Sequence, residues 1–172
     1  VSGKIENVVL VDIGASKMNI NIISDGISVL ARDIVVGSEQ LTDQIASALD
    51  VEYNQAERIK LGIESIENKK EEITTIFNQT CTQWVLEIKK AIDLYTANNP
   101  EKPLQSLVLS GGGSKVNGLT KYIEEETALK VIAFNPLSAM NIENKKFDQS
   151  YIEMIGPEMA IASGIAIRKS PF

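Results

Sequence analysis

The beginning of the sequence predicts three consecutive strands joined by tight turns, and this feature constrains the fold most. Residues 8–14 form an apolar run typical of a strand that is buried on both faces. Apolar and polar residues alternate over 17–24, as on a half-buried strand, and the Asp25-Gly26 pair predicts a hairpin turn before a third strand over 27–36. Successive strands with such short turns pair antiparallel, so we expect the sheet to begin as an antiparallel meander.

Helices are expected next. Gly37 ends the strand pattern, and Ser38 is a candidate N-cap for a helix over 39–49. A second helix is expected over 54–61. Apolar residues recur at helical intervals over 63–96, which predicts either one bent helix or two helices in succession.

The last third of the sequence predicts two further strands around a glycine-rich turn and a helix. We expect strands over 105–110 and 129–134, a helix over 117–127 between them, and a final helix opened by the Gly156-Pro157 pair. The complete order predicts an α/β fold, in which helices pack on a mixed sheet that contains the antiparallel meander.

Composition excludes several classes of function. The formal net charge is −6 and basic residues do not cluster, which argues against a nucleic-acid partner and against lipid binding by charge. The sequence has no histidine, so a histidine base or metal ligand is impossible. The single cysteine, Cys81, cannot form an internal disulfide, and with Trp84 it is expected in the core. No apolar run approaches the roughly 20 residues that span a bilayer, so we expect a cytoplasmic protein without direct membrane insertion.

The first candidate site is the turn Asp12-Ile13-Gly14-Ala15-Ser16, between two predicted strands. Exposed N–H groups in a tight turn of small residues can bind phosphate oxygens, and a carboxylate beside them can hold Mg²⁺ or its water. Taken alone, the turn is more typical of a hairpin in which the aspartate caps its own turn.

The second candidate site is a strand that runs into three glycines, Gly111 to Gly113, followed by Ser114. Each glycine costs roughly 0.5–1 kcal/mol of backbone entropy relative to alanine, which suggests that a flat or charged group approaches the backbone closely. A loosely packed connection is the alternative. The spacing excludes the phosphate loop of P-loop proteins, because Lys115 follows Ser114, and the dinucleotide fingerprint, because Val116 replaces its last glycine.

A third candidate is the pair Glu57 and Lys60, three residues apart on one helix face. The two side chains can clamp a ring between them, although a solvated charge pair is the commoner meaning of this spacing.

In order and spacing, these pieces resemble the second domain of the actin-like ATPases, which have a ribonuclease H-like fold and include sugar kinases, heat-shock chaperones, FtsA and PilM. The resemblance implies that the hairpin faces the β- and γ-phosphates of ATP, that Asp12 holds Mg²⁺ directly or through water, and that Glu57 and Lys60 lie beside adenine and ribose. We assign no catalytic residue. The residues implied to bind nucleotide are Asp12, Gly14, Ala15, Ser16, Lys17, Met18, Gly37, Glu57, Lys60, Gly111, Gly112, Gly113 and Ser114.

Within this group the sequence is most similar to the PilM family of type IV pilus assembly proteins. The resemblance implies a cytoplasmic scaffold, peripheral at the inner membrane, that recruits the cytoplasmic N-terminal segment of PilN and other pilus inner-membrane components. The matching stretches are 11–16, Gln40-Leu41-Thr42, 56–60, Asn135-Pro136, Phe147-Asp148 and 156–168.

The resemblance also implies a domain organisation. Residues 1–172 correspond to the second domain, with a sheet subdomain over about 1–37 and 104–172 and an inserted, mainly helical nucleotide-side subdomain over about 38–103. The first domain, which holds most of the PilN groove, is expected to be missing, so this half alone should bind ATP weakly.

The hairpin departs from its relatives. Ser16, Lys17, Met18 and Asn19 stand where FtsA-like proteins carry a glycine, two threonines and a second acid. Fewer hydroxyl and carboxylate groups can then position water, so we expect nucleotide binding with slow hydrolysis or none.

Two other functions fit parts of the pattern. An FtsA-like cell-division protein would carry a C-terminal amphipathic helix, whereas the sequence ends in Ile167-Arg168-Lys169-Ser170-Pro171-Phe172. A small-molecule kinase of the same fold would need an acceptor pocket and a base, both of which would lie in the other half.

Overall fold

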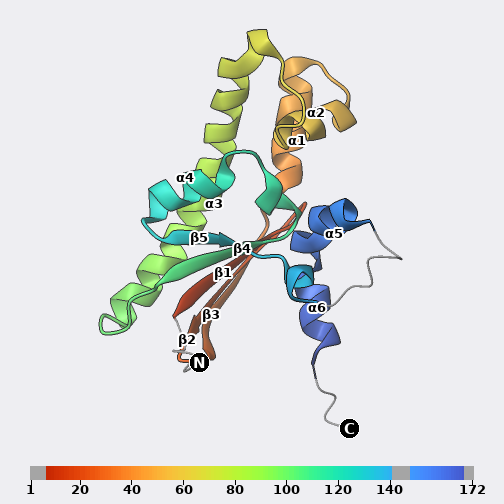
Figure 1. Ribbon diagram of the computed structural model, residues 1–172. Coiled ribbons are helices and arrows are strands. Elements are labelled where there is room, and N and C mark those ends of the chain that lie inside the picture. Colours follow the sequence, from red (N-terminus) through yellow and green to blue (C-terminus); the bar gives the residue numbers. More distant parts are fainter. Residues whose placement is uncertain (1–6, 141–147, 169–172) are drawn as a thin grey trace.

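The computed structural model describes residues 7–140 and 148–168, and it contains a five-stranded mixed sheet (Figure 1). The strand order is β3-β2-β1-β4-β5. The first three strands form the predicted antiparallel meander, and β4 and β5 extend the sheet in parallel from β1. The strands are β1 (Val8–Ile13), β2 (Met18–Ser24), β3 (Ile27–Ile34), β4 (Ser106–Ser110) and β5 (Lys130–Ala133).

Six α-helices and four short 3-10 helices belong to the described residues. The helices α1 and α2 form a pair at one end of the molecule, and the long α3 runs from there along the sheet (Figure 1). None of the described helices is both long and apolar enough to cross a membrane. The helices are α1 (Ser38–Leu49), α2 (Tyr53–Lys60), η1 (Glu67–Lys69), α3 (Lys70–Asn98), η2 (Gly112–Lys115), α4 (Leu119–Thr127), η3 (Pro136–Ala139), α5 (Gln149–Ile155), η4 (Gly156–Met159) and α6 (Ala160–Ala166).

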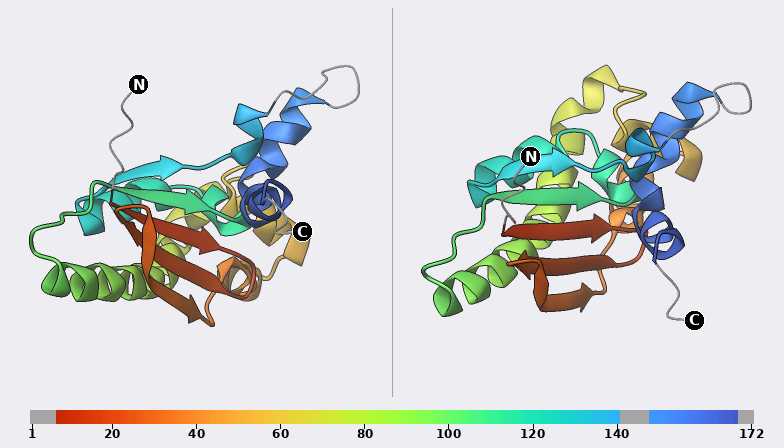
Figure 2. Two further views of the ribbon diagram at one scale, coloured as in Figure 1. Left: turned by 90° about the horizontal axis from the view of Figure 1, so that it is seen from below. Right: turned by 60° about the horizontal axis from the view of Figure 1, so that its bottom comes forward.

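The core lies between the sheet and the helices α1, α3 and α4. Val9, Val11 and Ile13 of β1 are fully buried there, whereas alternate residues of the strand are half-exposed. The expectation that β1 is buried on both faces is therefore wrong. The reason is that, among the described helices, α6 lies against the second face at one end of the strands (Figure 2). There Ala160 and Ile161 line a hollow beside Leu10, Asp12 and Val108.

Trp84 and Cys81 of α3 are both fully buried in this core, as predicted. Burial raises the pKa of the Cys81 thiol to about 12, which keeps it protonated at neutral pH. A single cluster of buried residues connects the meander, α1, α2, α3, α4, β4 and β5.

The helices differ from expectation at three places. The 63–96 stretch forms one α-helix of 29 residues that begins at Lys70. The Gly156-Pro157 pair opens the 3-10 helix η4 and not the last α-helix. An unpredicted helix, α5, precedes it, capped by Asp148, whose carboxylate accepts a hydrogen bond from the Ser150 N–H at 2.9 Å.

Some residues named in the sequence analysis are not described by the structure: Phe147 of one matching stretch, and the end of the C-terminal stretch 167–172. Residues 169–172 lie outside the described residues, as does the predicted opening of the sheet subdomain at residues 1–6.

The β1–β2 turn is bonded directly to the start of α1. The N–H groups of Ser38 and Glu39 each donate to a turn carbonyl, of Gly14 and Ala15 respectively, at 2.9 Å. Ser38 is consequently the first helical residue and not the predicted N-cap, because carbonyls of the turn already accept hydrogen bonds from the first two N–H groups of the helix.

Gly37 permits this contact. Its φ of −161° is extended backbone open to any residue, so conformation does not require glycine here. The lack of space requires glycine, because a Cβ at this position would lie 2.1 Å from the Ala15 carbonyl oxygen. The turn and α1 thus form one rigid backbone unit.

Replacing Gly37 by alanine is expected to lower the free energy of unfolding by about 1–3 kcal/mol, because two backbone segments must separate. Gly164→Ala is the matched control, since nothing lies within 4 Å of its Cβ and it sits inside α6. That variant should be neutral or gain up to about 1 kcal/mol. Urea unfolding measures both, and a Gly37→Ala variant as stable as the parent would contradict the contact.

Candidate functional site

A cavity of about 560 Å³ opens where β1 and β4 end, between the turn after β1 and the helices α1 and α2. Because β1 and β4 are parallel, their carboxyl ends meet at the same edge of the sheet, beside the glycine-rich loop. The cavity is lined by Asp12, Gly14, Ala15, Ser38, Glu39, Tyr53, Glu57, Lys60, Leu61, Gly111, Gly112, Lys115 and Glu158.

This cavity brings together the three candidate sites of the sequence. From the hairpin it contains Asp12, Gly14 and Ala15, from α2 Glu57 and Lys60, and from the glycine loop Gly111 and Gly112. Segments nearly a hundred residues apart in sequence therefore form one site.

The other predicted residues lie outside the cavity wall. Ser16 and Gly37 line a neighbouring hollow on the far side of the hairpin turn. The Lys17 side chain is exposed, whereas Met18 is fully buried in the core.

The two remaining residues stabilise the glycine loop. Gly113 is buried against β1, and the Ser114 hydroxyl donates to the Gly111 carbonyl at 2.6 Å.

Asp12 is held at the floor of the cavity. Its carboxylate accepts a hydrogen bond at 2.7 Å from the hydroxyl of Ser110, its register partner on β4. On the other side its antiparallel partner is Asn19, which carries no charge. The side chains of Asp12 and Asn19 lie on the second face of the sheet, which is only partly covered. Asp12 therefore stays accessible to solvent and to the cavity.

Two of the three glycines are required by the packing of the chain itself. A Cβ on Gly111 would lie 2.4 Å from the Ile13 carbonyl oxygen, and its φ of +84° is strained for other residues. A Cβ on Gly113 would lie 2.4 Å from the Ile13 side chain. Gly112 differs, because its nearest neighbour would be the Glu158 side chain at 3.7 Å. Of these three glycines, only Gly112 therefore has free space beside it, on the side that faces the cavity.

The hairpin turn offers unpaired backbone donors. Gly14 donates to the Lys17 carbonyl at 2.8 Å, which closes the turn. Within the described chain, the N–H groups of Ala15, Ser16 and Lys17 have no backbone acceptor. A turn with several free N–H groups is a suitable binding place for an anion.

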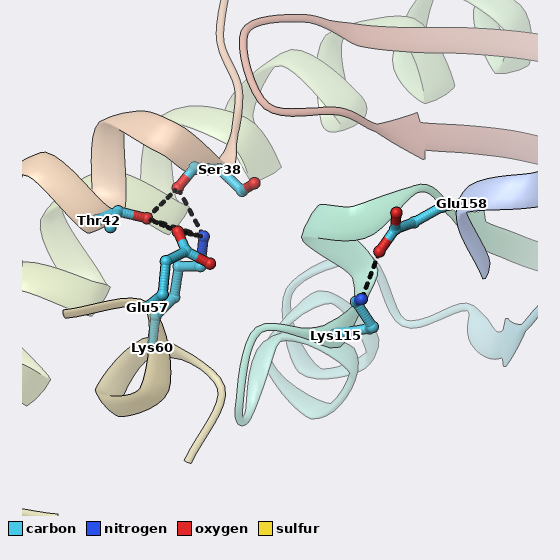
Figure 3. Close-up of polar contacts among 6 residues, drawn as sticks. All are labelled: Ser38, Thr42, Glu57, Lys60, Lys115 and Glu158. Atoms are coloured by element: carbon cyan, nitrogen blue, oxygen red, sulfur yellow. Dashed lines mark hydrogen bonds and ion pairs between the residues drawn. The ribbon is translucent and has the colours of Figure 1, made fainter. Parts of the chain in front are cut away.

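Lys60 is buried and held by three oxygens. Its side chain is only 5% exposed, and Nζ lies 2.5 Å from a Glu57 carboxylate oxygen. Nζ also donates to the Thr42 hydroxyl at 2.8 Å and to the Ser38 carbonyl at 3.4 Å (Figure 3). The alternative of a solvated Glu57–Lys60 pair is therefore wrong for the lysine.

A second ion pair stands on the opposite wall. Lys115 of η2 lies 2.5 Å from Glu158 of η4 and so joins the glycine loop to the C-terminal segment (Figure 3). The two residues are 43 positions apart and share no recognisable motif, so this pair could not be predicted from sequence.

Tyr53 is a further residue that the sequence analysis missed. It begins α2 one turn before Glu57, so helical spacing places both on the same face and was the available indication. Partial burial, together with the carboxylates of Glu57, Glu39 and Asp43, raises the pKa of the Tyr53 phenol. It therefore stays a neutral hydrogen-bonding group at neutral pH.

The cavity carries more negative than positive charge. The carboxylates of Asp12, Glu39, Glu57 and Glu158 face the ammonium groups of Lys60 and Lys115, which leaves a difference of two negative charges. Among the described residues no three acidic or cysteine side chains cluster closely enough to hold a metal ion by themselves.

A family model described as type IV pilus assembly protein PilM matches residues 2–170, which confirms the resemblance inferred from the motifs. Among solved structures, the chain is similar to a PilM-PilN type IV pilus biogenesis complex, with 21% identity and a TM-score of 0.77. That match covers 95% of this chain and 46% of the other.

Two further structures are similar. The ethanolamine utilization protein EutJ from Carboxydothermus hydrogenoformans has 20% identity and a TM-score of 0.65, over 95% of this chain and 50% of that one. The archaeal actin homolog Ta0583 in complex with ADP has 16% identity and a TM-score of 0.60, over 94% and 51%. These likenesses confirm the predicted actin-like fold, and this chain spans about half the length of each.

Replacing Glu57 by glutamine is expected to lower the free energy of unfolding by about 1–3 kcal/mol, because Lys60 is left as a buried cation without its carboxylate. Glu87→Gln is the matched control: Glu87 pairs with Lys90 at the same spacing and the same 2.5 Å, but Lys90 is 61% exposed. That loss should stay below about 0.5 kcal/mol. Denaturant unfolding compares them, and equal losses would contradict the buried role of Lys60.

Proposed function

Because the chain belongs to the type IV pilus assembly protein PilM family, we propose that it forms the ATP-binding half of a scaffold in pilus assembly. One observation carries the proposal: the hairpin turn, the glycine loop and the buried Glu57–Lys60 pair line a single cavity. Neither glycine turn alone favours a nucleotide over a structural role, whereas their convergence beside a buried cation does.

The residues present fit a nucleotide. Ala15, whose N–H has no backbone acceptor within the described chain, lines the cavity, and this N–H suits a phosphate oxygen. The free N–H groups of Ser16 and Lys17 follow directly after it in the hairpin turn. Gly112 leaves a flat, open patch of backbone on the cavity wall, and Glu57 and Tyr53 offer polar groups for a base or ribose. The actin homolog Ta0583, which shares the fold, is described in complex with ADP.

The charge of the cavity favours a nucleotide that arrives with a divalent cation. Both lysines already pair with glutamates, so phosphates alone would meet the net negative charge of the wall. Mg²⁺ usually binds through one or two carboxylates plus substrate phosphates. We assign Asp12 as the carboxylate that holds Mg²⁺, directly or through water. The hydrogen bond from Ser110 fixes the orientation of the Asp12 carboxylate.

We expect binding to matter more than hydrolysis. Met18 points into the core and Asn19 is uncharged, so Asp12 is the one carboxylate that the hairpin brings to the cavity. A single carboxylate engaged by a metal ion is poorly suited to activate water as well. Nucleotide would then act by stabilising one arrangement of the protein, since a ligand favours the state to which it binds more tightly.

We assign the chain to the second domain of the longer protein. Residues about 1–37 and 104–172 form its sheet subdomain, and about 38–103 form the helical subdomain on the nucleotide side. The scaffold would recruit the cytoplasmic N-terminal segment of PilN, mostly through the other half, and further inner-membrane components of the pilus machinery. It would be cytoplasmic and peripheral at that membrane. The solved complex of PilM with PilN supports the choice of partner.

The full-length protein should bind a fluorescent ATP analogue in the presence of Mg²⁺, and Asp12→Ala should weaken binding at least about tenfold, because the metal loses its ligand. Gly112→Val should do the same by filling the cavity wall. Asp33→Ala, an exposed carboxylate on the edge strand β3, is the control and should bind normally. Unchanged affinity in both site variants would remove the nucleotide assignment.

Pull-down of the full-length protein with the PilN N-terminal segment tests the pilus assignment separately. Retention should depend on nucleotide, and Asp12→Ala should reduce that dependence and leave nucleotide-free binding intact. Failure to retain the segment under any condition would argue against the scaffold role even if ATP binds.

A further inference from the structure

A second hollow, of about 710 Å³, lies on the other side of the hairpin turn from the candidate nucleotide cavity. It runs between α1 and α3, and a smaller hollow of about 540 Å³ continues it along α3. The two hollows share Gln44 and Gln79, so they form one groove, which we call the amide groove.

Five uncharged amide side chains line the amide groove, beside apolar residues such as Val35, Val36 and Ile76. Gln40 and Gln44 come from α1, and Asn78, Gln79 and Gln83 come from α3. Each amide offers both a donor and an acceptor. A peptide backbone presents the same alternation of donors and acceptors, so such a wall suits an extended main chain better than it suits an apolar helix.

One amide is already oriented by the protein. The hydroxyl of Thr80, which is 1% exposed, donates to the Gln44 side-chain oxygen. This bond fixes which end of the amide carries the oxygen. Among the described residues the Gln44 nitrogen has no hydrogen-bond partner, so it remains a donor at the middle of the groove.

The negative charge of the amide groove favours a partner with positively charged side chains. Glu39 and Asp43 stand on the α1 wall, and neither lysine nor arginine is among the residues that line either hollow. An incoming basic side chain would find acceptors there, whereas an acidic one would be repelled. From Glu39 to Ala48 the α1 wall extends about 14 Å, which is the length of about four residues of extended chain.

We propose that the amide groove binds an extended peptide segment of a partner protein, with a basic side chain directed at Asp43 and Glu39. The site is separate from the proposed nucleotide cavity, although the two share Ala15 and Glu39 as a wall. It does not depend on the identity of the nucleotide or on hydrolysis.

The test uses the full-length protein and a fluorescein-labelled peptide of alternating serine and lysine, with a twin in which glutamate replaces lysine. Fluorescence anisotropy should show binding of the lysine peptide alone. Ser47→Tyr, which fills the groove from α1, should weaken binding at least about tenfold, and Asp43→Asn should weaken it about two- to fivefold.

Asp93→Asn is the matched control, because Asp93 is an exposed carboxylate on α3 that lines neither hollow. It should leave peptide affinity unchanged. Equal weakening by Asp43→Asn and Asp93→Asn would mean general attraction to an acidic protein and would overturn the proposal. So would undiminished binding in Ser47→Tyr, or no binding of the lysine peptide. Binding of the ATP analogue, measured in the same samples, reports separately on the nucleotide cavity.

Discussion

The contact of the β1–β2 turn with its neighbours is the constraint on which the rest of the site depends. Two carbonyls of the turn accept the first N–H groups of α1, and the end of β1 packs directly on the glycine loop. Gly37, Gly111 and Gly113 all permit these close contacts, because a Cβ on any of them would clash with the end of β1 or with the turn that follows it. At Gly37 and Gly111 a Cβ would meet backbone atoms, so no side chain can adjust to relieve a change there. The hairpin, α1 and the glycine loop therefore keep fixed positions relative to one another, and the cavity between them is preformed.

Much of this architecture follows from the sequence. Period-two alternation and the Asp25-Gly26 turn predicted the meander, and the break at Gly37 predicted the start of α1. The glycines were recognised, but their purpose was not, because close approach of two backbones depends on three-dimensional packing that spacing does not reveal. The strand β1 was misjudged for a related reason: an apolar run does not tell which face a later helix will cover.

The side chains of the site were predictable only where they repeat a helical spacing. Glu57 and Lys60 stood out as a pair, although burial of Lys60 required Thr42 and Ser38 from another helix. Glu158 comes from the C-terminal segment and meets Lys115 through a long-range contact. Its carboxylate changes the charge of the cavity, which shows that the electrostatics of such a site belong to the assembled fold and not to any one motif.

The burial of Cys81 has a practical consequence. It is the single cysteine of the sequence, and its raised pKa together with complete burial keeps the reactive thiolate scarce. A cysteine introduced at an exposed position would then react with a maleimide dye selectively, without removal of the native thiol. One label on the helix pair α1–α2 and another on the C-terminal segment would report, by energy transfer between the dyes, the movement of one wall of the cavity against the other.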